Sequence, residues 1–318
     1  MVLTLTLNPA IDRTIIVDKL VYEDRAYIRS TTESPGGRGL NASRVLASFG
    51  METVSLVTAG GESGSKLVTL LNESGFAAEV VRVRSSTRTN LTIYDKQGLT
   101  LKLNEVGGEL ETAELQQMRH AVESRLSKAV WLMLCGSLPP GVPLNFYAEL
   151  IELANSQGVK TFLDTDDGAL RCGIEARPTV VKPNQPEAER LLGRALISRG
   201  RCAEAARSIQ ALGAGTVLLS LGSRGIVACS GEGDQAVVWE VVPPRVEALS
   251  PIGAGDAVAA AFVYATRQGS PLLEAVQLAA AAGTASALKP GMEFATLAEA
   301  KAMMKRLETR NVTNALLR

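Results

Sequence analysis

The segment 250–256 combines the residue types that phosphoryl transfer to a hydroxyl group requires. Gly253, Ala254 and Gly255 form a turn that leads into the small-residue stretch AVAAAFVYA, which predicts a helix. The N-terminus of a helix carries unpaired N–H groups and a partial positive charge, which together suit a phosphate group. Asp256 in the first helical turn can accept a proton. We therefore predict an anion site and a general base in one turn, with the alternative that Asp256 merely caps the helix.

A second glycine turn, with the sequence GGRGLN, also precedes a predicted helix. Gly37, Gly39 and Ala42 formally match the pattern of a dinucleotide-binding turn, which normally follows a hydrophobic strand. The segment before this turn is the polar RSTTESP, so the pattern favours a loop that admits a polyol. Gly36 and Gly37 would leave room for the ligand, and Asn41 offers both a donor and an acceptor. An ordinary glycine loop with an N-cap is the alternative.

Further polar residues follow predicted strands, where parallel sheets bind ligands. Asp12 comes soon after the first strand and could bind sugar hydroxyls. Asn184 and Glu187 stand three residues apart, so both could face one hydrated Mg²⁺. The remaining positions are Ser137 in GSLPPG, Lys182 in KPNQPE, and Ser220, Gly222 and Gly225 in SLGSRG. Each turn alone is a weak signal, but six such turns on one α/β chain without a Walker A sequence are together a strong one.

The composition excludes several classes of protein. Equal numbers of basic and acidic residues, 33 of each in 318, argue against a nucleic-acid partner, which needs a basic face. No apolar run approaches the roughly 18 residues of a membrane span, and no secretion signal is visible, so we expect a cytoplasmic protein. Four separate cysteines without a CxxC pair predict reduced thiols. With a single histidine and no GxSxG motif, the expected catalytic base is a carboxylate.

Strand-like and helix-like hydrophobic periods alternate along the chain, which predicts βαβ units and an α/β fold. Strand-like segments include 53–59, 130–136, 160–165 and 216–222, and helices are expected at 41–49, 66–74 and 187–192. Strands connected by helices form a mainly parallel sheet that is covered on both faces. The candidate residues would then meet at the carboxyl ends of the strands.

Residues 11–35 and 86–105 break this rhythm, because they are strand-like but polar. The second segment contains a predicted hairpin turn at Lys96-Gln97-Gly98. Together the two segments predict a small β-sheet that projects over the site as a lid. A half-exposed sheet of this kind commonly buries its open face against a copy of itself, so we expect a homodimer.

The motifs TLNPAID, GGRGLNASRVL, GSLPPGV, VKPNQPE, SLGSRG and GAGD occur in this order over essentially the whole chain. In this combination the sequence resembles the PfkB branch of the ribokinase-like sugar kinases, and within it the hexose-phosphate kinases. The resemblance implies a three-layer α/β core with a mainly parallel central sheet, formed by residues 1–10, 36–85 and 106–318. It also implies a β lid of residues 11–35 and 86–105 that serves dimerisation, and Mg²⁺-ATP as the phosphoryl donor.

The resemblance assigns a role to each candidate position. Asp256 would be the catalytic base, and Gly253, Ala254 and Gly255 would form the anion hole. The positions that match the substrate site are Asp12, Gly36, Gly37, Asn41 and Ser137 for the sugar, and Arg88 in TRTN and Arg25 in the lid for its phosphate. The positions that match the nucleotide and Mg²⁺ side are Lys182, Asn184, Glu187, Ser220, Gly222 and Gly225. A guanidinium fork suits a phosphate, so Arg88 favours a phosphorylated substrate; its alternative role is a charge that protects a lid edge.

Four features depart from the family pattern. Pro251 replaces a usual Thr before the GAGD turn, which removes a hydroxyl and an N–H near the nucleotide. Arg38 stands where Lys or Gly is usual, and Asn104-Glu105-Val106-Gly107 replaces a segment with proline after Asn-Glu. Lys289 lies in a region where some relatives bind a monovalent cation, so its ammonium could displace K⁺. These departures bear on substrate choice and potassium dependence, and none touches Asp256.

We therefore predict an ATP- and Mg²⁺-dependent kinase that phosphorylates a ketohexose phosphate, with fructose 1-phosphate as the first choice of substrate. Tagatose 6-phosphate and fructose 6-phosphate are the next alternatives, followed by a neutral sugar or a nucleoside. A catalytically silent sugar-phosphate sensor and a dinucleotide oxidoreductase are alternatives from other classes. The sequence does not fix which hydroxyl is phosphorylated, because that depends on small differences in sugar placement.

Overall fold

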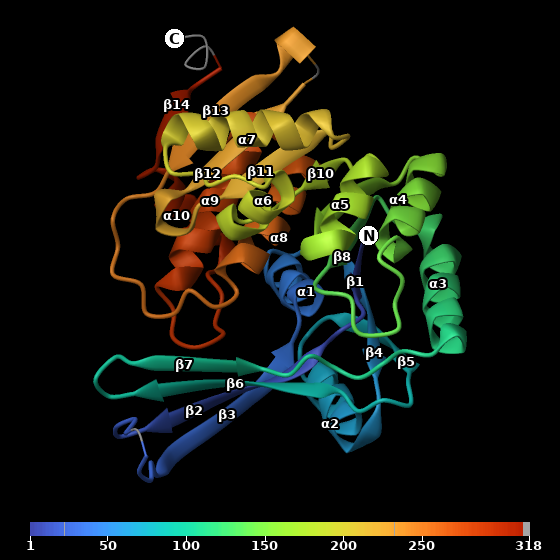
Figure 1. Ribbon diagram of the computed structural model, residues 1–318, viewed down its shortest axis with the longest axis vertical. Coiled ribbons are helices and arrows are strands. Elements are labelled where there is room, and N and C mark those ends of the chain that lie inside the picture. Colours follow the sequence, from blue (N-terminus) through green and yellow to red (C-terminus); the bar gives the residue numbers. More distant parts are fainter. Residues whose placement is uncertain (22, 232, 314–318) are drawn as a thin grey trace.

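The computed structural model describes residues 1–21, 23–231 and 233–313. Tyr22, Glu232 and residues 314–318, which the predicted lid and core include, lie outside the described residues. Within these described ranges, ten strands form a central sheet and four others form a separate small sheet; Figure 1 shows the two sheets.

In the central sheet, seven neighbouring strands are parallel and three more continue one edge in antiparallel order. In spatial order they are β5 (Ala77–Arg82), β4 (Thr53–Ala59), β1 (Val2–Thr6), β8 (Trp131–Cys135), β9 (Lys160–Asp164), β10 (Val180–Val181), β11 (Thr216–Ser220), β12 (Ile226–Ser230), β13 (Val237–Val242) and β14 (Glu308–Asn311). Every residue of β1 and β8 is buried, as expected for strands of a parallel sheet with both faces covered.

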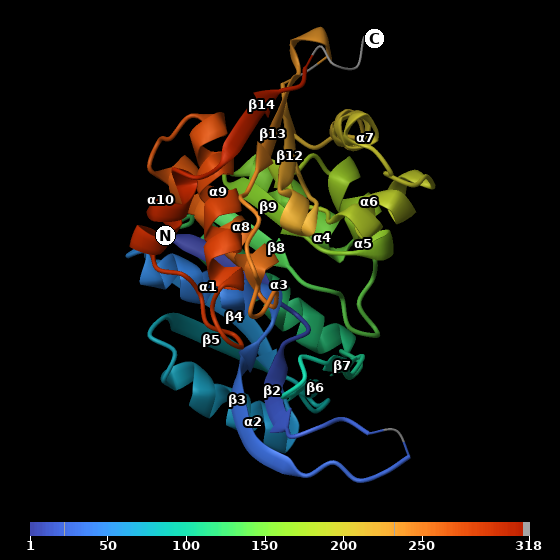
Figure 2. The same cartoon turned by 90° about the vertical axis from the view of Figure 1, so that its left-hand side faces the viewer.

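Helices cover both faces of this sheet and enclose two hydrophobic cores (Figure 2). Strand β8 shows the division, because Leu132 and Leu134 belong to one core and Trp131 and Met133 to the other. On the Leu132 side lie α3 (Thr112–Leu126), α4 (Phe146–Ser156), α5 (Asp167–Glu175), α6 (Gln185–Leu192) and α7 (Arg199–Ala211). On the opposite side lie α1 (Arg38–Ser48), α8 (Ala254–Arg267), α9 (Leu272–Ala287) and α10 (Leu297–Met304), while α2 (Gly61–Asn72) packs on β4 next to the small sheet.

The small sheet has the order β3–β2–β6–β7 and projects from the core below α1 (Figure 1). Its strands are β2 (Ala10–Val17), β3 (Ile28–Gly36), β6 (Arg88–Asp95) and β7 (Thr100–Asn104). Strands β2 and β6 are parallel, and the two outer pairs are antiparallel. The β6–β7 connection includes the predicted turn residues Lys96-Gln97-Gly98. We call this sheet the lid; the division of the chain into a core and a lid domain stays a proposal.

The predicted fold class, a mainly parallel α/β core with a small β-sheet, is confirmed. The antiparallel edge was not predicted. Its cause is local: five residues, 221–225, connect β11 to β12, and this is too short for a crossover to a parallel neighbour. Within the described ranges, no helix combines the length and the apolar character needed to cross a membrane.

Candidate active site

The turn before α8 is held in one conformation by its surroundings. Gly253 is the N-cap of α8 and has a φ of 75°, a left-handed conformation that glycine adopts without strain. A Cβ atom at this position would lie 2.7 Å from the ring of Phe294, so space also demands glycine. Pro251 contributes its carbonyl to the turn, which accepts a hydrogen bond from Ala254 N at 3.3 Å. Asp256 N donates to Gly253 O at 3.0 Å, so among the first three amides of α8 the N–H of Gly255 is the one without a partner in the described residues.

Asp256 lies in the first turn of α8 and is 9% exposed. Asn41 in α1 donates from Nδ2 to Asp256 Oδ2 at 2.7 Å, which joins the two predicted glycine turns. Burial, reinforced by the negative charge of Asp164, raises the pKa of Asp256 to about 7, although Asn41 and the nearby cations Lys182 and Arg38 oppose the rise. A carboxylate with a pKa near neutrality is well matched to general-base catalysis.

Lys182 places a positive charge next to this turn. It follows β10 directly, and its ammonium lies 2.9 Å from Asp164 Oδ2. A Cβ atom on Gly255 would stand 3.6 Å from Lys182 Nζ, so the charge adjoins the anion-binding amides. Burial disfavours the charged form of Lys182, but Asp164 outweighs it and the pKa is raised. Lys182 therefore stays protonated at neutral pH.

Sequence reasoning missed an acidic cluster around Arg38. The guanidinium of Arg38 contacts Asp164 Oδ1 at 3.0 Å, Asp166 Oδ2 at 3.0 Å and Glu187 Oε1 at 3.5 Å. Burial opposes the charge of Arg38, but the three carboxylates outweigh burial and raise its pKa. Asp164 ends the apolar strand β9, and the strand-end rule that identified Asp12 would also have identified it.

Asn184 and Glu187, the two residues predicted to face Mg²⁺, also stabilise the start of α6. Asn184 caps α6 in a reciprocal capping box: its side chain accepts from Glu187 N at 2.9 Å, and Glu187 Oε2 accepts from Asn184 N at 2.8 Å. The free oxygen Oε1 of Glu187 faces Arg38 and the acidic cluster. Oxygen donors suit Mg²⁺. In the described part of the chain, no three acidic, histidine or cysteine side chains are grouped so that they could hold a metal ion.

The predicted nucleotide loop lies beside this cluster. Ser220 at the end of β11 donates from its backbone N–H to Pro183 O at 3.0 Å, and it forms a bridge with Asn184. Gly222 and Gly225 have φ values of 60° and 96°. A Cβ atom on Gly225 would lie 2.0 Å from Val241 O, so this turn can form only with glycine.

Asp12 in β2 lies against one of the other predicted sugar residues, Gly36. Asn90 in β6 donates from Nδ2 to Asp12 Oδ1 at 2.8 Å. A Cβ atom on Gly36 would stand 2.3 Å from Asp12 Cγ, so the glycine backbone lies directly against the carboxylate. Burial raises the pKa of Asp12 despite the opposing effects of Asn90, Arg88 and Arg44. Gly37, with a φ of 131°, is the N-cap of α1, the helix whose Asn41 contacts Asp256.

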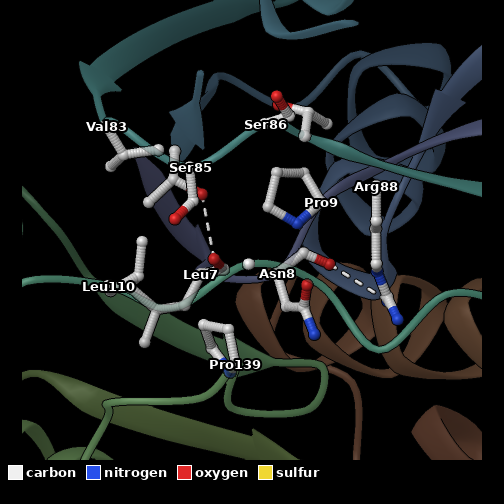
Figure 3. Close-up of a pocket in the computed structure, with 12 residues that line it drawn as sticks. Leu7, Asn8, Pro9, Val83, Ser85, Ser86, Arg88, Leu110 and Pro139 are labelled. Atoms are coloured by element: carbon white, nitrogen blue, oxygen red, sulfur yellow. Dashed lines mark hydrogen bonds between the residues drawn. The ribbon is translucent and has the colours of Figure 1, made fainter. Parts of the chain in front are cut away.

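Arg88 begins β6 and lies beside Asn8 (Figure 3). Its guanidinium donates to Glu105 O at 2.8 Å from Nη1 and to Asn8 O at 3.1 Å from Nη2. Ser137 is joined to the same region, because its hydroxyl oxygen accepts from Asn8 Nδ2 at 3.2 Å. The predicted phosphate-binding and sugar-binding residues Arg88, Ser137 and Asp12 thus share one side of the site.

Arg25 is the predicted site residue that the structure does not bring to the others. It lies in the long connection between β2 and β3, is exposed, and its backbone N–H donates to Asp24 Oδ1 at 2.7 Å. A contribution of Arg25 to phosphate binding requires a movement of this loop or a second copy of the chain.

Comparison with known proteins places this arrangement among sugar kinases. The family model described as "pfkB family carbohydrate kinase" matches residues 5–299. The chain is similar to a 1-phosphofructokinase of Rhodobacter capsulatus, with 34% identity over 87% of each protein. It is also similar to the ATP-dependent 6-phosphofructokinase isozyme 2 of Escherichia coli K12, with 32% identity over 91% of this chain and 93% of that protein.

Solved structures agree with these sequence matches. Phosphofructokinase-2 of Escherichia coli in complex with potassium superimposes with a TM-score of 0.87 at 29% identity, covering 96% of this chain and 98% of that one. The tetrameric inhibited form of the same enzyme gives a TM-score of 0.85 over the same shares of both chains.

Proposed function

The chain belongs to the pfkB family of carbohydrate kinases, and on that premise we propose that it phosphorylates a ketohexose phosphate, first of all fructose 1-phosphate to fructose 1,6-bisphosphate. It is an ATP-dependent sugar-phosphate kinase. The observation that carries the substrate class is the position of Arg88. This arginine shares a side of the site with Asp12 and Ser137, while the buried carboxylate of Asp256 lies in the anion-binding turn.

The proposed mechanism assigns one task to each group. Asp256 accepts the proton of the attacking hydroxyl, which makes the oxygen a better nucleophile. The amides at the start of α8 and the ammonium of Lys182 stabilise negative charge on the transferred group. Asp12, Asn41 and Ser137 orient the sugar, and Arg88 holds its phosphate. The lid carries Asp12 and Arg88, so its position over the core also limits access of water to the site.

Mg²⁺ would be held on the side of Glu187, Asp164 and Asp166, where it would neutralise charge on the ATP phosphates. Arg38 already neutralises part of this acidic cluster. The ammonium of Lys289 pairs with Glu299 in α10, and this pairing is the main cause that lowers the pKa of Glu299 to about 2. Because its ammonium is paired with Glu299, Lys289 does not need to occupy the place of a bound K⁺. We therefore propose that potassium affects the activity. Four free cysteines, three of them buried, fit the proposed cytoplasmic location.

A coupled assay of ADP release tests the substrate class. Mg²⁺-ATP is supplied with fructose 1-phosphate, tagatose 6-phosphate, fructose 6-phosphate, fructose and ribose in turn. We expect kcat/KM to be highest for a phosphorylated ketohexose, because charge-assisted contacts to a phosphate are absent for a neutral sugar. Preference for fructose or ribose would refute the role of Arg88 but leave the kinase activity intact. The same assay in sodium and in potassium buffers measures the potassium effect.

We further propose that the lid forms a homodimer. Strand alternation places Asp12 on one face of the lid and Ile15 on the other. Register pairs Ile15 with Ile93 and Ile93 with Leu101, while Leu91 pairs with Leu103, so the β6–β7 part of the second face is apolar. Arg13 and Glu33 lie on the β2–β3 part of this face and form an ion pair. Leu101 and Leu103 are 43% and 50% exposed. An exposed apolar sheet face is a typical surface for association with a second copy.

Replacing Leu103 with Glu should dissociate this dimer. Burial of a carboxylate against an apolar partner face is strongly unfavourable. One chain has a mass of 33.6 kDa. We expect light scattering after gel filtration to give twice this mass for the wild type and this mass for Leu103→Glu. The control is Leu144→Glu, because Leu144 is 56% exposed but lies outside the lid, before α4. A dimer that persists in Leu103→Glu, or that is also lost in the control, would argue against association through this face.

A further inference from the structure

We propose that Asn8 is a positioning residue that fixes Arg88 and Ser137 for the sugar-phosphate substrate, an inference that rests on the proposed sugar-phosphate kinase function. Asn8 follows β1, at the carboxyl edge of the central sheet, and is 7% exposed. A buried side-chain amide must find hydrogen-bond partners within the protein. The partners of Asn8 come from three separate segments of the chain.

The side-chain amide of Asn8 donates in two directions. Its Nδ2 group lies 2.9 Å from Val106 O and 3.2 Å from Ser137 Oγ. A hydroxyl that accepts from Asn8 keeps its own hydrogen free, so Ser137 can donate that hydrogen to an oxygen of the substrate. Asn8 therefore determines which way the Ser137 hydroxyl donates.

The same residue holds Arg88 through its backbone. Asn8 O accepts from Arg88 Nη2 at 3.1 Å, and Glu105 O accepts from Nη1 at 2.8 Å (Figure 3 shows the first contact). Glu105 is fixed in turn, because Glu105 Oε2 accepts from Thr89 N at 2.8 Å. Because Nδ2 of Asn8 also binds the carbonyl of Val106, the segment that supplies the Glu105 carbonyl is tied to Asn8 as well.

There is little room for the amide to move. A Cβ atom on Gly107 would lie 2.3 Å from Asn8 Oδ1, so the backbone at 107 lies against the side chain. The cavity that adjoins Asn8 and Arg88 has a volume of only about 20 Å³, which is space for about one water molecule. The segment 105–107, where this sequence departs from the family pattern, is thus the segment that Asn8 binds.

Removing the amide should weaken sugar-phosphate binding specifically. In Asn8→Ala, Ser137 and Val106 lose a donor, and we expect the KM for the preferred ketohexose phosphate to rise about tenfold. The KM for ATP should stay within about twofold, because the contacts of Asn8 lie on the side of Arg88. Calorimetric titration with the same sugar phosphate should show a matching loss of affinity without turnover. Asn145→Ala, at an exposed amide that donates to Glu149, is the control and should change neither constant.

A mutant cycle separates positioning from general stability. If Asn8 acts through Ser137 and Arg88, Asn8→Ala should change the KM by less than about twofold in a background that carries both Ser137→Ala and Arg88→Ala. Asn8→Asp, which keeps the shape of the side chain but offers no donor to Ser137 or Val106, should reproduce the tenfold rise if Asn8→Ala folds poorly. Equal effects of Asn8→Ala on the constants for ATP and sugar phosphate, or a full effect of Asn8→Ala in the Ser137→Ala, Arg88→Ala background, would overturn the proposal. A wild-type enzyme without activity on any ketohexose phosphate would instead refute the proposed function, and the titration would still test Asn8.

Discussion

Asp256→Asn should lower kcat by about 10²–10⁴-fold or more, because the variant cannot accept the proton of the attacking hydroxyl. The amide keeps the shape of the carboxylate and can still accept the hydrogen bond from Asn41 Nδ2. ATP binding should therefore change by less than about threefold in a calorimetric titration. Near-normal turnover by the purified variant would refute the assignment of Asp256 as the base.

The raised pKa of Asp256 adds two pH-dependent consequences. The ionised form is the active base, so kcat/KM of the wild type should fall as the pH drops through about 7, the pKa of this group. A carboxyl group whose pKa is raised by folding stabilises the protein at low pH and loses this contribution as the pH rises through the folded value. Asp256→Asn should therefore have a higher Tm than the wild type at pH 8, and this difference should disappear near pH 4. An unchanged difference across this range would show that Asp256 is not the titrating group.

Arg88→Ala should lower kcat/KM for the preferred sugar phosphate by about 10²-fold, mainly through KM. Two charge-assisted hydrogen bonds from one guanidinium to a phosphate account for a loss of this size. Arg88→Lys keeps the charge but loses the planar fork, so it should recover part of the loss. Initial rates at varied sugar phosphate and saturating ATP measure both variants.

The control for Arg88→Ala is Arg84→Ala, which removes an arginine four residues earlier in the sequence. The Arg84 side chain is 85% exposed and pairs at the surface with Glu111, so its removal should leave both Michaelis constants unchanged. If Arg84→Ala and Arg88→Ala had equal effects, general charge rather than a specific phosphate contact would explain the result. An unchanged kcat/KM in Arg88→Ala would contradict the proposed phosphate site.

Much of the central fold follows from local patterns. The strand predicted at 53–59 is β4, and the glycine turns before α1 and α8 stand where the sequence places them. The helix predicted at 66–74 begins earlier, at Gly61, because its first turn carries few apolar residues and so lacks a periodic signal. The strands β13 and β14 were not predicted, since their place at the sheet edge depends on register with β12 rather than on their own residues.

By itself, the sequence determined which groups are available: a carboxylate in a glycine turn, Asn41 in a second turn, an arginine in the lid, and polar residues after several strands. These depend on short-range features, such as helix starts and strand ends, that neighbouring residues specify. Only the tertiary structure decided the contacts between distant segments. Asn41 lies 215 positions from Asp256, and Asn8 lies 80 positions from Arg88, yet each pair is hydrogen-bonded. The raised pKa of Asp256 and the acidic cluster around Arg38 arise for the same reason, because burial and charge are properties of the assembled site.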